Sequence, residues 1–67
     1  MSTVHVHAAE TLRQLRGDRT QQTVAEAVGT SQQAIARYEN GTRVPSDEMK
    51  ARIAEYYKVS VTDIFYR

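Results

Sequence analysis

A chain of 67 residues that contains no cysteine has few means of stabilising a fold. A domain of this size buries only about 60% of the surface that its unfolded chain exposes, so its core is marginal. Disulfides and thiolate metal sites, which support many small domains, are both excluded here. We therefore expect a single domain that is stabilised by well-packed helices or by association with a second copy.

The apolar residues are too dispersed for a membrane protein. No apolar run approaches the roughly 18 residues that a membrane helix needs. The first residues, MSTVHVH, also lack the apolar stretch of a signal peptide. Together with the absence of cysteine, this predicts a cytoplasmic protein that stays where it is made.

The charge is modest in total but uneven along the chain. The formal net charge is only +1, which is weak support for a nucleic-acid partner because DNA-binding domains are commonly basic. Between residues 12 and 43, however, arginines outnumber acidic residues, whereas the rest of the chain is balanced or acidic. These arginines are Arg13, Arg16, Arg19, Arg37 and Arg43, against Asp18, Glu26 and Glu39.

Helix signals divide the chain from residue 8 onward into five short helices. Leu12 and Leu15 have helical spacing, and Gly17 with Asp18 then supplies a stop signal. Each later apolar stretch follows a Ser or Thr that can cap a helix, and glycines follow the second and third helices. The expected caps are Thr20, Thr30 or Ser31, Ser46 and Ser60, and the expected inward residues are Val24, Ala25, Val28, Ala34, Ile35, Tyr38, Met49, Ile53, Ala54, Tyr57, Ile64 and Phe65.

The start of the chain permits more than one structure. Residues 2–7 alternate polar and apolar side chains, which is typical of a short strand, although a disordered arm has the same pattern. We assign residues 1–7 to an N-terminal arm and residues 8–67 to one domain.

Three residues in the middle of the chain have the spacing of two helices joined by a tight turn. Ala25 is small where the two helices would touch, Gly29 lets the chain reverse, and Ile35 is a branched apolar anchor for the second helix. Glutamine can bond adenine N6 and N7 together, and arginine can bond guanine O6 and N7, so the outward face suits the major groove. That face carries no acidic group and consists of Ser31, Gln32, Gln33, Ala36 and Arg37.

Residues 20–40, TQQTVAEAVGTSQQAIARYEN, resemble the phage repressor and Cro family of helix-turn-helix proteins, also called the Xre type. The resemblance extends through Gly41 and Pro45 to the closing VSVTDIF. It implies an all-α bundle of five short helices that binds double-stranded operator DNA as a homodimer. The third helix would enter the major groove, and the function would be that of a transcriptional regulator, most simply a repressor.

The resemblance also implies roles for individual residues. Arg16 and Glu39 match a buried ion pair between the first and third helices, which fixes geometry more than it adds stability. Base contacts are implied for Gln32, Gln33 and Arg37, although any of them could instead be solvated surface. Phosphate or mixed contacts are implied for Gln21, Ser31, Asn40 and Gly41. Apart from the resemblance, Arg43 is a further candidate for a phosphate contact, with an ordinary surface charge as the alternative.

The sequence departs from the family pattern at three places. The loop before the second helix, residues 17–19, is short; Arg19 stands where an apolar residue is usual; and Thr30 replaces an apolar residue in the turn. These departures leave open how the first helix docks, more than they affect the recognition helix.

No catalytic or cofactor site is expected. The chain has no phosphate-cradling glycine loop and no arrangement of Ser, His and Asp for nucleophilic catalysis. His5 and His7 would share one face of a strand, but two histidines without a cysteine or a nearby carboxylate make a poor metal site. The alternative to a DNA-binding regulator is therefore a protein-interaction module of the same fold, such as an antitoxin or a coactivator, which the low net charge keeps open.

Overall fold

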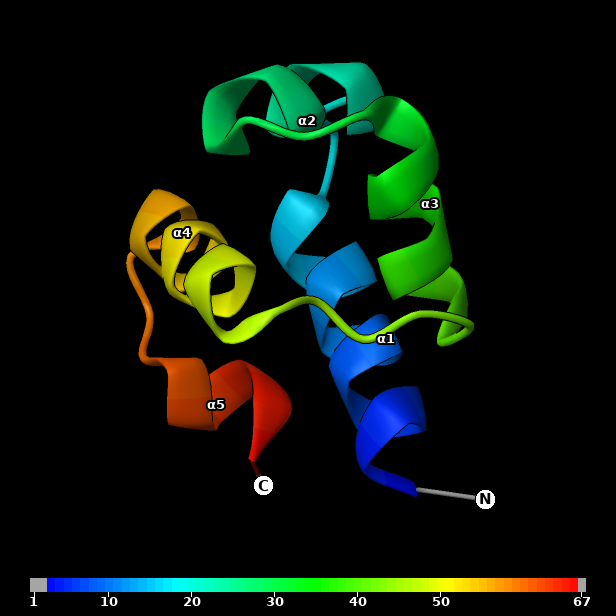
Figure 1. Cartoon of the computed structure of the whole chain (residues 1–67), viewed down its shortest axis with the longest axis vertical. Coiled ribbons are helices and arrows are strands. Elements are labelled where there is room, and N and C mark those ends of the chain that lie inside the picture. Colours follow the sequence, from blue (N-terminus) through cyan, green and yellow to red (C-terminus); the bar gives the residue numbers. More distant parts are fainter. Residues whose placement is uncertain (1–2, 67) are drawn as a thin grey trace.

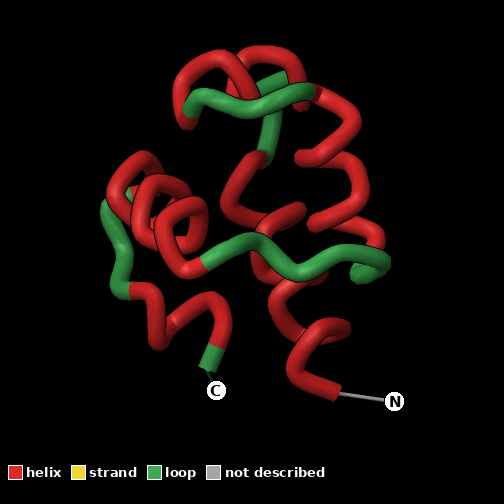
Figure 2. Tube along the Cα trace, viewed as in Figure 1, coloured by secondary structure: helices red, strands yellow, loops and turns green. Residues whose placement is uncertain are grey.

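A computed structural model of the chain describes residues 3–66, and the side chains of residues 7–66. Within residues 3–66 the chain forms helices joined by loops, and no strand is present (Figure 2). This all-α arrangement of five helices is the fold that the sequence predicts. The helices are α1 (Thr3–Arg16), α2 (Gln21–Val28), α3 (Gln32–Asn40), α4 (Asp47–Tyr57) and α5 (Val61–Phe65).

Helix α1 begins earlier than expected. The strand considered for residues 2–7 is wrong from Thr3 onward, because residues 3–7 are helical and continue without a break into Ala8. The boundary expected between an arm and the domain thus falls inside α1. A strand here would leave its backbone N–H and C=O groups without a neighbouring strand, whereas a helix pairs them internally. Residues 1 and 2 lie outside the described residues.

Hydroxyl side chains cap the starts of four helices. In each case the hydroxyl oxygen accepts a hydrogen bond from the backbone N–H three residues later, which satisfies one of the free donors of the first turn. All four caps are those expected from the sequence, with Ser31 rather than Thr30 capping α3. The caps are Thr20, Ser31, Ser46 and Ser60.

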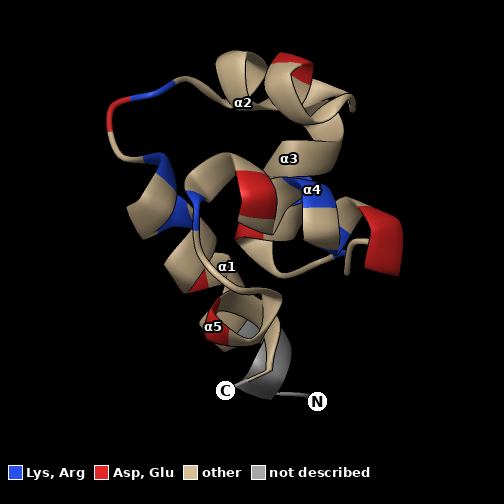
Figure 3. Cartoon of the chain, turned by 90° about the vertical axis from the view of Figure 1, so that its left-hand side faces the viewer, with Lys and Arg blue, Asp and Glu red and all other residues tan. Residues whose placement is uncertain are grey.

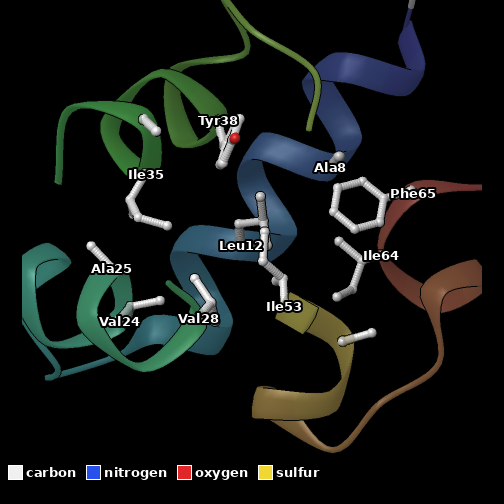
Figure 4. Packing of buried hydrophobic residues seen from close by; sticks show 12 residues of the cluster. Ala8, Leu12, Val24, Ala25, Val28, Ile35, Tyr38, Ile53, Ile64 and Phe65 are labelled. Carbon is white, nitrogen blue, oxygen red and sulfur yellow. The ribbon is translucent and has the colours of Figure 1, made fainter. Parts of the chain in front are cut away.

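The core lies between the two halves of the bundle, with Leu12 of α1 at its centre (Figure 4). Helix α3 packs on α1 and α2, while α5 packs on α1 and α4, and α2 also touches α4 (Figure 1). The expected inward residues are buried except for Met49 and Tyr57, which are half-buried against the core. None of the helices in residues 3–66 has the length and apolarity needed to cross a bilayer.

Candidate nucleic-acid interface

The turn between α2 and α3 has the geometry that its three spaced residues predict. Ala25 is 1% exposed and Ile35 is 3% exposed, so both pack in the core beside the turn. Gly29 has a φ of 83°, a left-handed conformation that only glycine adopts without strain. The N–H groups of Gly29 and Thr30 both donate to the Ala25 carbonyl, each over 2.9 Å. Helix α3 is therefore held at a fixed angle to α2 by a three-residue connection.

One face of α3 is buried and the other is open to solvent. Ala34, Ile35 and Tyr38 pack inward, and the only acidic side chain of the helix, Glu39, is buried as well. The open face therefore carries no negative charge. Its exposed residues are Gln32, Gln33, Arg37 and Asn40.

The arginines on and after α3 keep their charge available. Among the described side chains, the ion pairs join Arg16 to Glu39, Lys50 to Asp47 and Arg52 to Glu48, so Arg37 and Arg43 take part in none. Both are exposed. Seen from the side opposite α3, helix α4 instead carries acidic and basic segments next to each other (Figure 3). Arg37 and Arg43 thus place positive charge that no ion pair of a described side chain neutralises on α3 and just after it.

Arg16 of α1 and Glu39 of α3 meet as the resemblance implies. The Arg16 Nε donates to Glu39 Oε2 over 2.8 Å, and this hydrogen bond raises the pKa of Arg16 above its ordinary value. The pair is buried at one end only, since the Glu39 side chain is 4% exposed and that of Arg16 is 24% exposed. Arg13 also donates to the backbone carbonyl of Glu39. Helix α1 therefore holds α3 from behind its open face.

Two glutamines extend this contact to the surface. The Gln21 Nε2 donates to Glu39 Oε1 over 3.0 Å, and the Gln32 Nε2 donates to Gln21 Oε1 over 2.8 Å. No pattern in the sequence predicts these bonds, because they depend on how α2 and α3 are placed relative to each other. The result is a continuous chain of hydrogen bonds from Arg16 to Gln32.

The residues expected to contact phosphate differ in their exposure and in the hydrogen bonds that they already make. Asn40 and Arg43 are exposed, and Gln21 is half-buried. The Ser31 Oγ accepts the Ala34 N–H as the cap of α3, and the Gly41 N–H donates to the Tyr38 carbonyl where that helix ends. Gly41 therefore has no free donor for a phosphate and could contribute only close approach of the backbone. Their contacts with DNA stay predictions.

Arg19 shows how α1 and the loop after it dock. Its guanidinium carbon lies 5.5 Å from the ring centroid of Tyr56 and 5.7 Å from that of Tyr57, and its Nη1 donates to the Leu15 carbonyl over 3.0 Å. A cation–π contact thus occupies the place where an apolar side chain is usual.

Burial raises the pKa of Tyr57 to about 12, with Glu39 acting in the same direction, so its hydroxyl stays neutral at ordinary pH.

No metal-binding cluster of three or more His, Asp or Glu side chains is found in the described part of the chain. The His7 Nε2 lies 3.5 Å from the Thr11 hydroxyl, and the side chain of His5 lies outside the described residues.

Comparison with known families agrees with this geometry. A family model described as Helix-turn-helix matches residues 10–64 and so spans the five helices described above apart from the start of α1 and the last residue of α5. No match was found among curated proteins or among solved structures. The family consists of DNA-binding domains that are not enzymes. The chain belongs to the Xre/Cro type of this helix-turn-helix family.

Proposed function

We propose that the chain is a transcriptional repressor that binds operator DNA as a homodimer, with α3 in the major groove. The observation that carries this proposal is the open face of α3, which presents Gln32, Gln33 and Arg37 with no acidic side chain beside them. A bound dimer would repress by occupying the promoter. It would need no catalytic group to do so.

Base selection and positioning fall to different residues in this proposal. In it, Gln32, Gln33 and Arg37 read base edges, while residues that flank α3 approach the DNA backbone and fix the register. Arg43 is the cation of this second set, and the others are Gln21, Ser31, Asn40 and Gly41.

Two exposed apolar side chains support a dimer. Val44 is 42% exposed and Tyr66 is 54% exposed, and Tyr66 would be covered in part if a second copy packed against residues 59–66. Two copies on a two-fold axis would place their α3 helices in successive major grooves, about 34 Å apart.

Selection of bound sites from random duplex DNA tests the whole proposal. We expect enrichment of an inverted repeat whose half-sites lie about one helical turn apart. Failure to enrich any sequence would contradict sequence-specific binding. A single asymmetric half-site occupied by one protomer would contradict the dimer while leaving the DNA-binding function in place.

A protein-interaction module is the second candidate function. It is favoured by the net charge of only +1 and by a groove of about 790 Å³ between α2 and α4, on which Ala27, Ala51 and Tyr56 lie. Retention on a DNA column that falls with rising salt supports the first function. A stoichiometric protein partner together with no salt-dependent DNA retention supports the second.

A further inference from the structure

The outer face of α4 carries four charged side chains whose signs alternate along the helix. In chain order they are Glu48, Arg52, Glu55 and Lys58, and all four are exposed. We propose that this face, the α4 charged face, binds the same face of a second copy with the two α4 helices antiparallel. It does not include residues 59–66, on which the proposed DNA-binding dimer is expected to pack.

The four side chains lie on one side of α4. Residues three or four positions apart share a helix face, and Arg52 donates to Glu48 over 2.7 Å. Lys58 follows the end of the helix, and it lines the groove between α2 and α4 together with Arg52 and Glu55. Ile53, on the opposite side of α4, is 1% exposed in the core. The charged face is therefore directed to solvent along the whole helix.

The order of the signs makes this face complementary to itself. A two-fold contact uses the same patch on both copies, so the patch has to match its own reverse. The order acidic, basic, acidic, basic becomes basic, acidic, basic, acidic when the helix is reversed. Arg52 then lies opposite the partner's Glu55, and Glu48 lies opposite the partner's Lys58. Parallel helices would instead place each charge against its own copy.

Both pairings fit one position of the two-fold axis. The midpoint between residues 52 and 55 lies between residues 53 and 54, and the midpoint between residues 48 and 58 is residue 53. At about 1.5 Å of rise per residue, these two midpoints are less than about 1 Å apart. A single antiparallel contact therefore pairs every charge of the face with an opposite charge.

Contacts within one copy account for only half of the pattern. Arg52 forms an ion pair with Glu48, four residues before it, which is an ordinary way to stabilise a helix. Among the described side chains, neither Glu55 nor Lys58 takes part in an ion pair. A second copy supplies a partner for both of them.

The face has room for a second helix but is small. Ala51 on α4 and Ala27 on α2 line the groove beside it, and small side chains allow two helices to approach to about 8–10 Å. Helix α4 has 11 residues, and a contact along one such helix falls short of the roughly 1,200 Å² that a stable interface buries. We therefore expect weak association in the free protein. It becomes stronger where copies are held close together, because their effective concentration is then higher.

The position of the α4 charged face gives this association a consequence for DNA. Helix α4 lies on the other side of the molecule from α3 (Figure 1), and Figure 3 faces the side that carries it. Copies that meet through α4 are back to back, so each keeps its α3 free. Two DNA-bound dimers joined in this way would hold two duplexes, or two sites of one duplex, together. This consequence rests on the proposed function, whereas the contact itself does not.

Two charge reversals test the contact through their mixture. Glu48→Lys alone places Lys against Lys at both ends of the contact, and Lys58→Glu alone places Glu against Glu. When the two variants are mixed, each supplies the sign that the other lacks. A loss of stability in either variant cannot produce such a recovery. Glu10→Lys is the matched control, because Glu10 is exposed on α1 and its reversal gives the same net charge as Glu48→Lys.

The first measurement uses NMR spectra of the free proteins at low salt. Wild type should show concentration-dependent shifts at the backbone amides of the α4 charged face. Isotope-labelled Glu48→Lys should bind unlabelled Lys58→Glu about tenfold or more tighter than either variant binds itself. The shifts should vanish in about 1 M salt, where charges are screened beyond about 3 Å. Glu10→Lys mixed with Lys58→Glu should recover less, because one end of the contact still opposes two acids.

Three outcomes would overturn the contact. They are a wild type without shifts on α4 up to about 1 mM protein, a mixture that binds no tighter than its components do, and a recovery as large with Glu10→Lys as with Glu48→Lys. The last would assign the attraction to net charge alone.

The second measurement asks whether the contact bridges DNA. The duplex that wild type selects is fixed to a surface, loaded with protein, and offered the same duplex in solution with a fluorescent label. Wild type and Glu10→Lys should capture the free duplex, and Glu48→Lys should capture several-fold less while binding the fixed duplex as before. Equal capture by Glu48→Lys would overturn the bridging. If wild type selects no duplex, the proposed function fails instead, and the NMR mixture still decides whether the contact exists.

Discussion

Arg16 and Glu39 share one ion pair, yet their surroundings differ enough to give unequal mutant effects. Arg16→Met would leave a buried carboxylate without its cation, and we expect the free energy of unfolding to fall by about 3–5 kcal/mol. Glu39→Gln leaves a guanidinium that is 24% exposed and that also donates to the Arg19 carbonyl. Its cost should be smaller, about 1–3 kcal/mol. Urea denaturation of both variants measures this difference, and equal costs would mean that solvent reaches both ends of the pair.

Arg37 lies on the same open face as Gln33, one helical turn further along, and has no ion pair with any described side chain. Arg37→Ala should lose about 1–3 kcal/mol of binding free energy on the selected duplex and relax the preference at one base pair of each half-site. Arg43→Ala is the matched control and should weaken all duplexes alike. Titrations against single-base variants at one fixed salt concentration measure both. An even loss with Arg37→Ala would identify Arg37 as a phosphate contact.

Tyr57 predicts a decline of stability at high pH. Its pKa is raised from 10.0 to about 12, mainly by burial. Below pH 10 the hydroxyl is protonated in both the folded and the unfolded chain, so its contribution to stability is fully present. Between about pH 10 and 12 the unfolded chain loses this proton and the folded chain keeps it, so stability should fall as pH rises.

Urea denaturation from pH 9 to 12 checks this expectation. Tyr57→Phe should flatten the decline, whereas Tyr66→Phe, a change at an exposed ring, should leave it as it is. The same slope in wild type and Tyr57→Phe would assign the decline to other groups.

At the scale of single residues, the sequence predicts which side chains are exposed better than it predicts their hydrogen-bond partners. Gln32, Gln33, Arg37 and Asn40 are exposed as expected, because helical spacing alone decides which side of α3 faces the core. The partners of Gln21 could not be predicted, since they belong to another helix whose position relative to α2 is set by the whole core.

At the scale of the helices, we expect substitutions at the residues that follow α2 and α4 to have opposite effects on the stability of the fold. Each helix is followed by a residue in the left-handed region, Gly29 with φ 83° and Lys58 with φ 61°. Lys58→Gly should remove backbone strain and stabilise the fold by about 0.5–1 kcal/mol. Gly29→Ala should destabilise it by about 1–2 kcal/mol. The added Cβ would lie 3.1 Å from Arg52 Nη1, the mobile end of a long side chain, so the φ angle dominates this cost. Thermal melting of the two variants should show shifts of opposite sign, and shifts of the same sign would contradict the strain argument.

The helix starts were predictable because a cap is a local interaction. A hydroxyl and an N–H three residues later are brought together by the first turn itself, whatever surrounds it. The start of α1 was missed for the complementary reason. Its alternating Val and His residues are compatible with a strand and with a helix. The rest of α1 favours the helix, because it continues the helix that these residues begin.

For the molecule as a whole, the low net charge predicts a modest dependence of DNA binding on salt. If each protomer neutralises two or three phosphates, the logarithm of the binding constant should fall with the logarithm of salt concentration with a slope of about −4 to −5. Arg43→Ala should reduce the magnitude of this slope by about 2 in a dimer, since each protomer loses one phosphate contact. Gln33→Ala removes no charge and should keep the slope. Titrations at several salt concentrations measure it, and an unchanged slope in Arg43→Ala would place Arg43 away from the backbone of the DNA.

The fold class was predictable at this scale, because a short chain with five amphipathic segments, four of them capped, has few ways to enclose a core. The placement of Arg19 over Tyr56 and Tyr57 was not predictable from the sequence. This contact joins the loop after α1 to the end of α4, and nothing in the sequence of either segment indicates that the two lie together.

The bonds that run from Glu39 through Gln21 to Gln32 also bear on how such a protein can be redesigned. A recognition helix is commonly regarded as a part that can be transplanted from one scaffold to another. Here Gln32 of α3 hydrogen-bonds to Gln21 of α2, which in turn bonds to Glu39, so a graft of α3 alone would leave Gln32 without this partner. A scaffold that receives Gln32 would have to supply the partner at position 21 as well. Exchange of DNA specificity would then proceed by pairs of helices rather than by single ones.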